Sequence, residues 1–168
     1  MHICLFTSSV LLGPLASKQS KPFVQAIPET YAAAEQAAGF VWRAPPTETI
    51  FDEAGKPKRG AYLAIPSFYE DPDRVVQTLS VWSDLPSAWN YVYRGTHLSA
   101  LKQRAEWMEK PVRAQYVLWW APIGAIPTDS DGVQRLELLD QTGPTPEAFT
   151  FRKAFSSSGE PIASRGQA

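Results

Sequence analysis

The sequence predicts an α+β fold in which helices pack on one face of a sheet. Segments whose apolar residues recur every three or four positions alternate with short apolar runs that are typical of strands. Their order is strand, helix, strand, strand, helix, strand, helix, strand, and this interleaving indicates an α+β sheet. The centre of that order, β-α-β-β-α-β, is a ferredoxin-like unit. The length of 168 residues suits a single domain of about 100–200 residues, which we place at 1–155.

The predicted unit begins with a strand, a helix and a second strand. Ile3–Val10 is an apolar run without clean alternation, which is typical of a strand buried on both faces. Lys21–Ala38 has the apolar spacing of a helix. Pro28 is expected to kink or restart that helix because proline has no N–H to donate. Gly39 supplies the stop, and Phe40–Arg43 is expected to be a short strand.

The middle of the chain is predicted to pass through loops before it returns to the sheet. Thr47–Gly60 is polar and reads as a loop, and Ala61–Tyr69 is expected to be extended at most, because Pro66 disfavours a central strand. Val75–Trp82 alternates as a strand should. Ser83 or Asp84 can then cap a helix over Leu85–Arg94.

The last third supplies two further helices and two strands. Helical spacing predicts helices over Thr96–Glu109 and Asp131–Gln141. Arg113–Ala121 is rich in β-branched and aromatic residues and is the clearest strand signal. Ala148–Phe151 is expected to be a short final strand. The Ser- and Gly-rich segment 156–168 is expected to be a disordered tail.

Charge and cysteine content exclude several classes of function. The chain has 16 Lys and Arg against 17 Asp and Glu, so it lacks the general positive charge that nucleic-acid binding uses. Its single cysteine, Cys4, excludes an internal disulfide and a cysteine-based zinc site, and it is expected to be an inert core thiol. No apolar stretch approaches the roughly 20 residues of a membrane span. We therefore expect a cytoplasmic protein without a membrane span.

His97 is the main candidate for chemistry. Because a helix turns about 100° per residue, His97 and Arg104 lie on the same edge of the apolar stripe in their predicted helix. The imidazole could act as an acid, a base or a metal ligand, and Arg94 or Arg104 could hold an oxyanion. In the alternative interpretation, His97 only caps or bonds locally, and Arg104 is solvated or paired with a nearby glutamate.

Aromatic residues are frequent and cluster around this helix. They make up 12% of the chain, which suggests an aromatic-lined cavity or interface. Side chains of adjacent strand residues point to opposite faces, so at most one of Trp119 and Trp120 can face such a cavity. A core and dimer-interface role is the alternative. The predicted ligand-contacting residues are Trp82, Tyr91, Tyr93, Trp107 and Trp119.

Several familiar catalytic motifs are absent from the sequence. It contains no Gly-x-Gly-x-x-Gly, no His-Glu-x-x-His and no Gly-x-Ser-x-Gly, so a dinucleotide loop, a metalloprotease helix and a hydrolase elbow are not expected. No second histidine lies close enough in sequence to join His97 as a metal ligand.

A combination of short segments resembles a bacterial and fungal family of domains of unknown function. The resemblance runs from about Phe23 to Phe151. It rests on Gly39–Arg43, Leu79–Trp82, Tyr93-Arg94 with His97, Arg104 with Glu106-Trp107, Leu118–Pro122 and Gly143–Phe151. A Pro-rich insertion at about 44–74 departs from the usual pattern and could form a lid or extend a dimer contact.

The resemblance implies a dimeric α+β barrel, in which two ferredoxin-like chains pair their sheets. Superfamily relatives include antibiotic-biosynthesis monooxygenases, haem-binding oxygenases, a spheroidene monooxygenase and polyketide cyclases, with a ligand cavity between the sheet and its helices. It therefore implies a homodimer that binds a hydrophobic small-molecule substrate.

We therefore expect a monooxygenase-like enzyme of specialised metabolism that acts on an aromatic or polyketide-type substrate. His97 would be an acid–base group without a cofactor, or an axial ligand if haem is the cofactor. A cyclase or isomerase that uses the same pocket without oxygen, a non-catalytic binding module and a purely structural dimer remain as alternatives.

Overall fold

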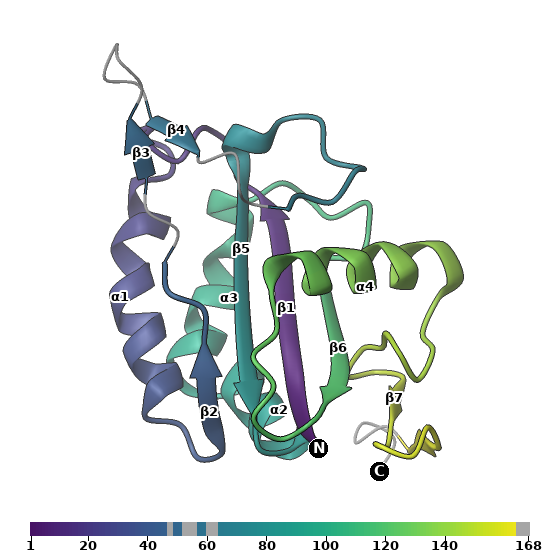
Figure 1. Cartoon of the computed structure of the whole chain (residues 1–168). Helices are drawn as coiled ribbons and strands as arrows, with labels where there is room; N and C mark the ends of the chain where they lie inside the picture. The colour runs from purple at the N-terminus through teal and green to yellow at the C-terminus, as the bar shows by residue number, and fades with distance from the viewer. Residues whose placement is uncertain (47–48, 52–56, 60–63, 164–168) are drawn as a thin grey trace.

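Four strands form one antiparallel sheet with β1 at its centre. A computed structural model describes residues 1–46, 49–51, 57–59 and 64–163. In it, β1 (His2–Val10), β2 (Phe40–Arg43), β5 (Val75–Trp82) and β6 (Tyr116–Ala121) are arranged in the order β2-β5-β1-β6 (Figure 1). All three neighbouring pairs are antiparallel. With its two helical crossovers, this order is that of the ferredoxin-like fold, and the predicted fold class is confirmed.

Strand β1 is buried on both faces, as its sequence predicts. Ile3 and Leu5 belong to one core cluster, whereas Cys4 and Phe6 belong to another. These four side chains are at most 4% exposed. Because successive side chains of a strand alternate between faces, β1 takes part in two separate hydrophobic cores.

Three helices cover one face of the sheet. They are α1 (Lys21–Glu35), α2 (Leu85–Tyr93) and α3 (Gly95–Trp107). Asp84 caps α2, as predicted, by accepting a 2.7 Å hydrogen bond from the N–H of Ser87. Pro28 lies within α1, but the helix does not restart there. Its ring is exposed, so water can reach the carbonyl group that lacks its N–H partner.

Helix α4 (Asp129–Thr142) crosses the opposite face, in front of β1 and β6 in Figure 1. Thr128 and Asp131 form a capping box at its start. Val133, Leu136 and Leu139 then complete the second core. A second copy that closed a barrel face to face would have to displace this helix, and the dimeric barrel stays a prediction.

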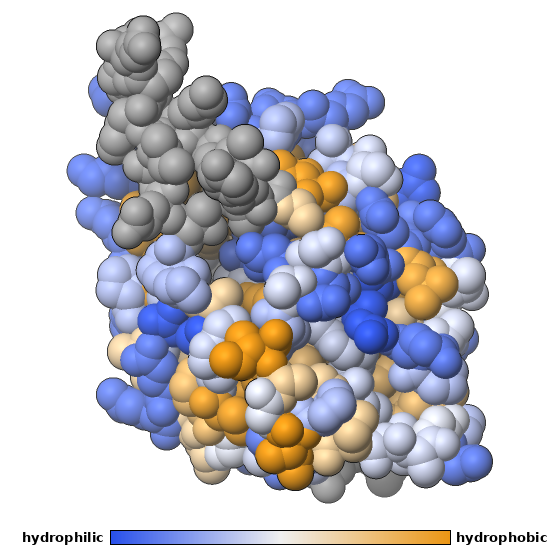
Figure 2. All heavy atoms as spheres, in the orientation of Figure 1, coloured by the Kyte–Doolittle hydropathy of each residue, from blue (hydrophilic) through white to orange (hydrophobic). Residues whose placement is uncertain are grey.

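Exposed apolar residues gather on the α4 side of the molecule. Figure 2 shows them low on this face, below α4. The loop between β6 and α4 contributes Ile123 and Ile126, which are 72% and 67% exposed. None of the helices in the described part of the chain has the length and apolar character needed to cross a membrane.

The end of the chain differs from its prediction. Segment 148–151 forms no strand and makes only two isolated bridges, Leu118 with Phe149 and Thr145 with Ala148. Instead, β7 (Ala154–Phe155) pairs with β8 (Pro161–Ile162), and β8 lies inside the segment 156–168 expected to be a disordered tail. The Ser156 hydroxyl accepts from the N–H of Glu160 at 3.1 Å. The turn also uses the positive φ of Gly159, a conformation that glycine adopts without steric cost.

The insertion contains one hairpin and a short 3₁₀ turn. Strands β3 (Thr49–Phe51) and β4 (Pro57–Arg59) pair with each other, and η1 (Pro72–Arg74) leads into β5. The rest of the predicted loop 47–60, and residues 61–63 of the next segment, lie outside the described residues. Residues 64–69 form no strand.

We expect Gly132→Ala to lower the free energy of unfolding by about 1–2 kcal/mol. A Cβ atom at this position in α4 would lie 2.5 Å from the Phe6 ring. Overpacking costs about 1–3 kcal/mol, whereas the helix-propensity gain is about 0.5–1 kcal/mol. Urea denaturation followed by tryptophan fluorescence measures the difference. Gln141→Ala, an exposed change in the same helix, is the control, and an equally stable Gly132→Ala protein would contradict this packing.

We expect the Cys4 thiol to be unreactive until the protein unfolds. The side chain is fully buried, and burial raises the pKa of its thiol to about 12. Since the thiolate is the nucleophile, only about 10⁻⁴ of the thiol is reactive at pH 8. Labelling with Ellman's reagent should therefore be slow in buffer and give one equivalent in denaturant. Rapid labelling of the native protein would argue against this burial.

Candidate functional site

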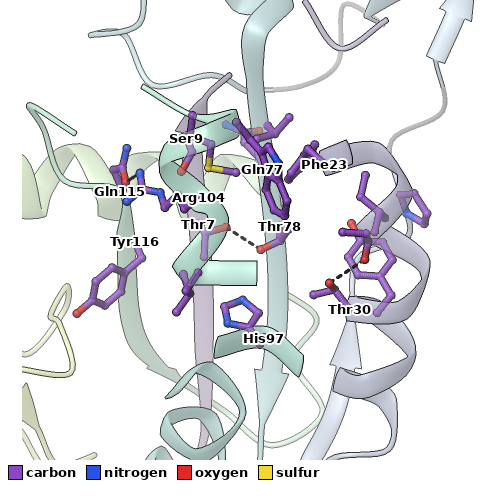
Figure 3. Close-up of a pocket in the computed structure, with 18 of the residues that line it drawn as sticks. Thr7, Ser9, Phe23, Thr30, Gln77, Thr78, His97, Arg104, Gln115 and Tyr116 are labelled. Atoms are coloured by element: carbon purple, nitrogen blue, oxygen red, sulfur yellow. Dashed lines mark hydrogen bonds between the residues drawn. The ribbon is translucent and has the colours of Figure 1, made fainter. Parts of the chain in front are cut away.

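A cavity of about 290 Å³ lies between the sheet and helices α1 and α3 (Figure 3). Its floor comes from one face of the sheet, and its walls come from the two helices and the segment after β1. The apolar lining residues include Leu15, Phe23, Ala26, Ile27, Val76, Leu101, Trp107 and Met108. A concave, mainly apolar cavity with a few polar groups is the usual form of a small-molecule site.

Hydroxyl groups cross the floor of the cavity. Thr7 of β1 and Thr78 of β5 are direct partners in the antiparallel register. Their hydroxyl oxygens are 2.7 Å apart, and both residues line the cavity. Either hydroxyl can donate to the other, so the pair has a spare donor and spare lone pairs for a ligand.

His97 is held at the break between α2 and α3. The break arises because Arg94 is extended and Gly95 has a φ of 59°, which glycine adopts at little cost. The His97 Nδ1 atom lies 3.0 Å from the carbonyl oxygen of Val92, in the last turn of α2. A carbonyl oxygen can only accept, so Nδ1 carries the proton and Nε2 has a free lone pair.

Aromatic rings support the imidazole. The Tyr91 ring centroid is 4.7 Å from that of His97. Trp82 stacks on Tyr91 in turn, with ring centroids 4.8 Å apart. The Tyr91 hydroxyl donates to the carbonyl oxygen of Thr30 at 3.3 Å, which ties α2 to α1. Trp82 and Tyr91 are not among the residues that line the cavity, so they position His97 and do not contact the ligand space.

Burial keeps the His97 imidazole neutral. Loss of solvent lowers the pKa of His97 below its ordinary value of 6.5, and the hydrogen bond to Val92 opposes this shift in part. A neutral imidazole with a free Nε2 lone pair is a competent general base near pH 7.

Arg104 lies toward the other end of the cavity. It is seven residues after His97 on α3, which corresponds to about 10 Å along the helix axis. Its guanidinium donates to Oε1 of Gln115, just before β6. In Figure 3, His97 lies on one side of the Thr7–Thr78 pair, and Arg104 and Gln115 lie on the other. Burial lowers the pKa of Arg104, but an arginine stays charged in proteins.

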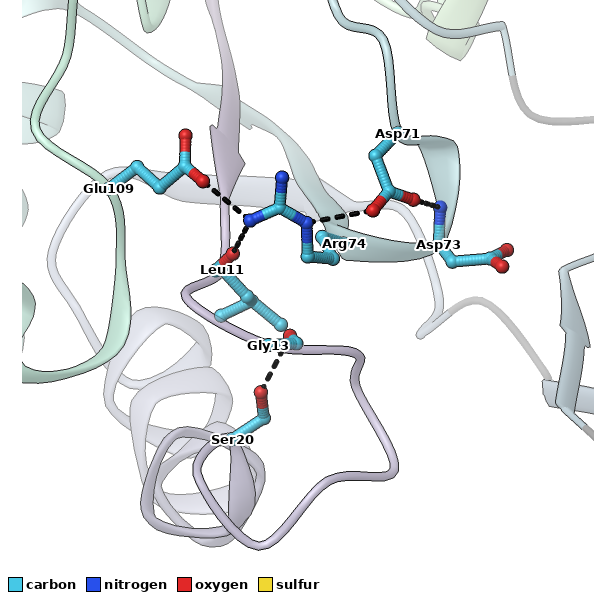
Figure 4. Close-up of polar contacts among 7 residues, drawn as sticks. All are labelled: Leu11, Gly13, Ser20, Asp71, Asp73, Arg74 and Glu109. Carbon is cyan, nitrogen blue, oxygen red and sulfur yellow. Dashed lines mark hydrogen bonds and ion pairs between the residues drawn. The ribbon is translucent and has the colours of Figure 1, made fainter.

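An arginine outside the cavity fixes the adjacent end of α3 (Figure 4). Arg74 donates to Asp71 at 2.8 Å, to Glu109 at 2.5 Å and to the carbonyl oxygen of Leu11 at 3.1 Å. These contacts join the segment before β5 to the segments that follow β1 and α3. They hold the chain beside Trp107 and Met108, which line the cavity.

The structure brings together only part of the predicted site. His97, Arg104 and Trp107 all line the cavity. Arg94 does not, because its guanidinium lies over the Trp89 ring at 5.7 Å. Tyr93 packs against Trp89 and Phe151 instead.

Trp119 lies on the other face of the sheet. It belongs to the core under α4, and Arg135 lies 5.2 Å from its ring centroid. Trp120 points to the face covered by α1, α2 and α3. There its indole N–H donates to the carbonyl oxygen of Phe155 at 2.8 Å. The alternation of strand side chains accounts for this difference. The roles assigned to the predicted site residues stay predictions.

The polar floor of the cavity and its wall from α1 were not predicted from the sequence. Thr7 and Ser9 are two residues apart on β1 and line the cavity with Thr78, Gln115 and Tyr116. The spacing of Thr7 and Ser9 was a usable signal, because residues i and i+2 of a strand share a face. No comparable signal marks Gln115, which is brought beside Arg104 only by the tertiary structure.

The described residues provide no cluster for a metal ion. Within them, no three or more His, Cys, Asp or Glu side chains are grouped so that they could hold one.

A family model described as "Domain of unknown function (DUF3291)" matches residues 2–165. The search of curated proteins found no match.

Solved structures with low sequence identity resemble it in shape. One is a putative antibiotic biosynthesis monooxygenase from Nitrosomonas europaea, with 9% identity, a TM-score of 0.49 and coverage of 73% of this chain and 92% of that one. Another is SnoaB, a cofactor-independent oxygenase from Streptomyces nogalater, with 13% identity, a TM-score of 0.46 and coverage of 76% and 98%. A third is a dabb family protein with a ferredoxin-like fold from Mesorhizobium loti, with 10% identity, a TM-score of 0.41 and coverage of 74% and 100%.

We expect His97 to titrate below pH 6.5 with its proton on Nδ1 in the neutral form. Burial favours the neutral ring, so the folded protein binds this proton less tightly than the unfolded chain does. The free energy of unfolding should therefore fall as the pH drops from about 6.5 through the folded-state pKa. Nitrogen-15 NMR of the imidazole measures both the tautomer and the midpoint. A proton on Nε2, or a midpoint above 6.5, would contradict this geometry.

Proposed function

The chain belongs to the DUF3291 family of domains of unknown function, and we propose that it is an acid–base enzyme that removes a proton from a mainly apolar small molecule. The observation that carries this proposal is the position of the His97 imidazole at the edge of the cavity. Its Nδ1 atom is committed to the carbonyl of Val92 at 3.0 Å, and its ring borders the cavity. Nε2 is then the atom that accepts the proton.

The rest of the cavity suits a flat, hydrophobic substrate that carries oxygen. Phe23 and Trp107 lie edge to face at 6.0 Å and form part of the wall, which favours contact with a planar ring system. Next to His97, the Thr7–Thr78 pair can donate to an oxygen atom that becomes negative as the proton leaves. An aromatic or polyketide-type phenol or enolisable ketone has both features.

Proton removal opens two routes, and we propose monooxygenation as the one this protein uses. An electron-rich carbanion can react with dioxygen as co-reactant, so that a CH₂ group becomes a carbonyl group and the second oxygen atom leaves as water. The substrate supplies all the electrons, and no external reductant is needed. If dioxygen does not react, return of the proton or ring closure would make the protein an isomerase or a cyclase.

The cavity does not fit a haem. Its volume of about 290 Å³ lies at the lower end of the range for drug-sized ligands, about 300–1,000 Å³. A haem is a larger and rigid plane, and it would have to separate α1 from α3. We therefore derive no step through a haem.

We expect the protein to accelerate deuterium exchange at the CH₂ group of anthrone, a planar tricyclic ketone, in the absence of oxygen. His97→Gln should slow this exchange by about 100-fold or more, because general base catalysis contributes about 10²–10⁴-fold. Proton NMR measures the exchange, and an oxygen electrode measures uptake when air is admitted. The matched control is His2→Gln, which changes the other histidine, on β1 outside the cavity.

Each outcome separates the proposed classes. Exchange and oxygen uptake that both depend on His97 would support monooxygenation. Exchange without oxygen uptake would indicate an isomerase or a cyclase. Binding without exchange, detected by quenching of tryptophan fluorescence, would indicate a non-catalytic binding module and overturn the enzymatic proposal. Equal exchange rates in His97→Gln and wild type would remove His97 as the base.

A further inference from the structure

We propose that the substrate is a carboxylic acid whose carboxylate is bound by Arg104, while its apolar body lies along the cavity toward His97. This inference rests on the proposed function, because it assigns a substrate class to the same cavity. It comes from a different set of contacts, those at the Gln115 end.

The positive charge of Arg104 is not neutralised by any carboxylate in the described part of the chain. The ion pairs found there are Arg43–Glu35, Arg74–Asp71, Arg74–Glu109 and Arg113–Asp140. Glu109, one residue that could have paired with Arg104, is held by Arg74 at 2.5 Å. A half-buried guanidinium without such a counter-ion favours an anion from outside.

The local contacts prepare Arg104 for that anion. Its side chain is bonded to the Gln115 amide oxygen, which is neutral and leaves the charge in place. A guanidinium has five N–H donors in a planar fork, so donors remain for a carboxylate. Gln115 also lines the cavity, and its NH₂ group is a further donor for the same ligand.

The position of Arg104 limits the shape of the acid. His97 and Arg104 are two helical turns apart, about 10 Å along α3. The apolar residues Leu101, between them on the helix, and Trp107, which follows Arg104, also line the cavity. One oxygen of a substrate cannot meet both side chains at that separation without large movement of the arginine. The carboxylate and the reacting C–H group are therefore at opposite ends of the molecule.

The test compares two probes that differ only in charge, 2-naphthoic acid and 2-naphthamide. Isothermal titration calorimetry at pH 7.5 should show that wild type binds the acid at least tenfold more tightly than the amide. Arg104→Gln should lose this preference and keep its affinity for the amide. Arg104→Lys, which keeps the charge but not the fork, should retain part of it.

Two controls isolate the role of Arg104. Lys102→Gln removes an exposed cation from the same helix and should leave the preference unchanged. His97→Gln should also keep the preference for the acid, although it should slow proton exchange with anthrone. Circular dichroism and thermal unfolding show whether each variant is folded.

Three results would overturn the inference. They are equal binding of acid and amide by wild type, an unchanged preference in folded Arg104→Gln, and loss of the preference in Lys102→Gln. None of them affects the anthrone exchange assay, which tests the base at the other end of the cavity. Failure of anthrone exchange with an intact preference for the acid would instead support the acid-binding role of Arg104 and count against base catalysis by His97.

Discussion

Burial of β1 on both faces is the constraint on which the rest of the structure depends. Ile3 and Leu5 need a helical layer on one side, and Cys4 and Phe6 need a second layer on the other. Helices α1 to α3 satisfy the first requirement, and α4 satisfies the second. Toward the end of β1, Thr7 and Ser9 replace apolar residues on the face that α1 to α3 cover. The helical layer there encloses a cavity with a polar floor.

Helix α4 determines which side of the sheet can take a ligand. Gly132 lets it approach so closely that a single added carbon would meet the Phe6 ring at 2.5 Å. The sheet face beneath α4 is filled with side chains, including Trp119. The described ligand space with His97 and Arg104 therefore lies wholly on the other side, between the sheet and α1 and α3.

The hydrogen bond between His97 and Val92 joins the local structure to the chemistry. A carbonyl group at the end of α2 has no partner within its own helix, and the imidazole N–H satisfies it. That same bond leaves the lone pair on Nε2. The local capping role and the proposed catalytic role are therefore compatible, since they use different nitrogen atoms of one ring.

The sequence by itself determined the order of the four sheet strands and of the helices, the double burial of β1, and the helix that carries His97, Arg104 and Trp107, because these follow from spacing along one segment. Only the tertiary structure decided that Arg94 lies over Trp89, that Trp119 faces α4 and that Gln115 contacts Arg104. These outcomes depend on which face of a strand each layer covers and on how distant segments meet. Periodicity within one element carries no information about either.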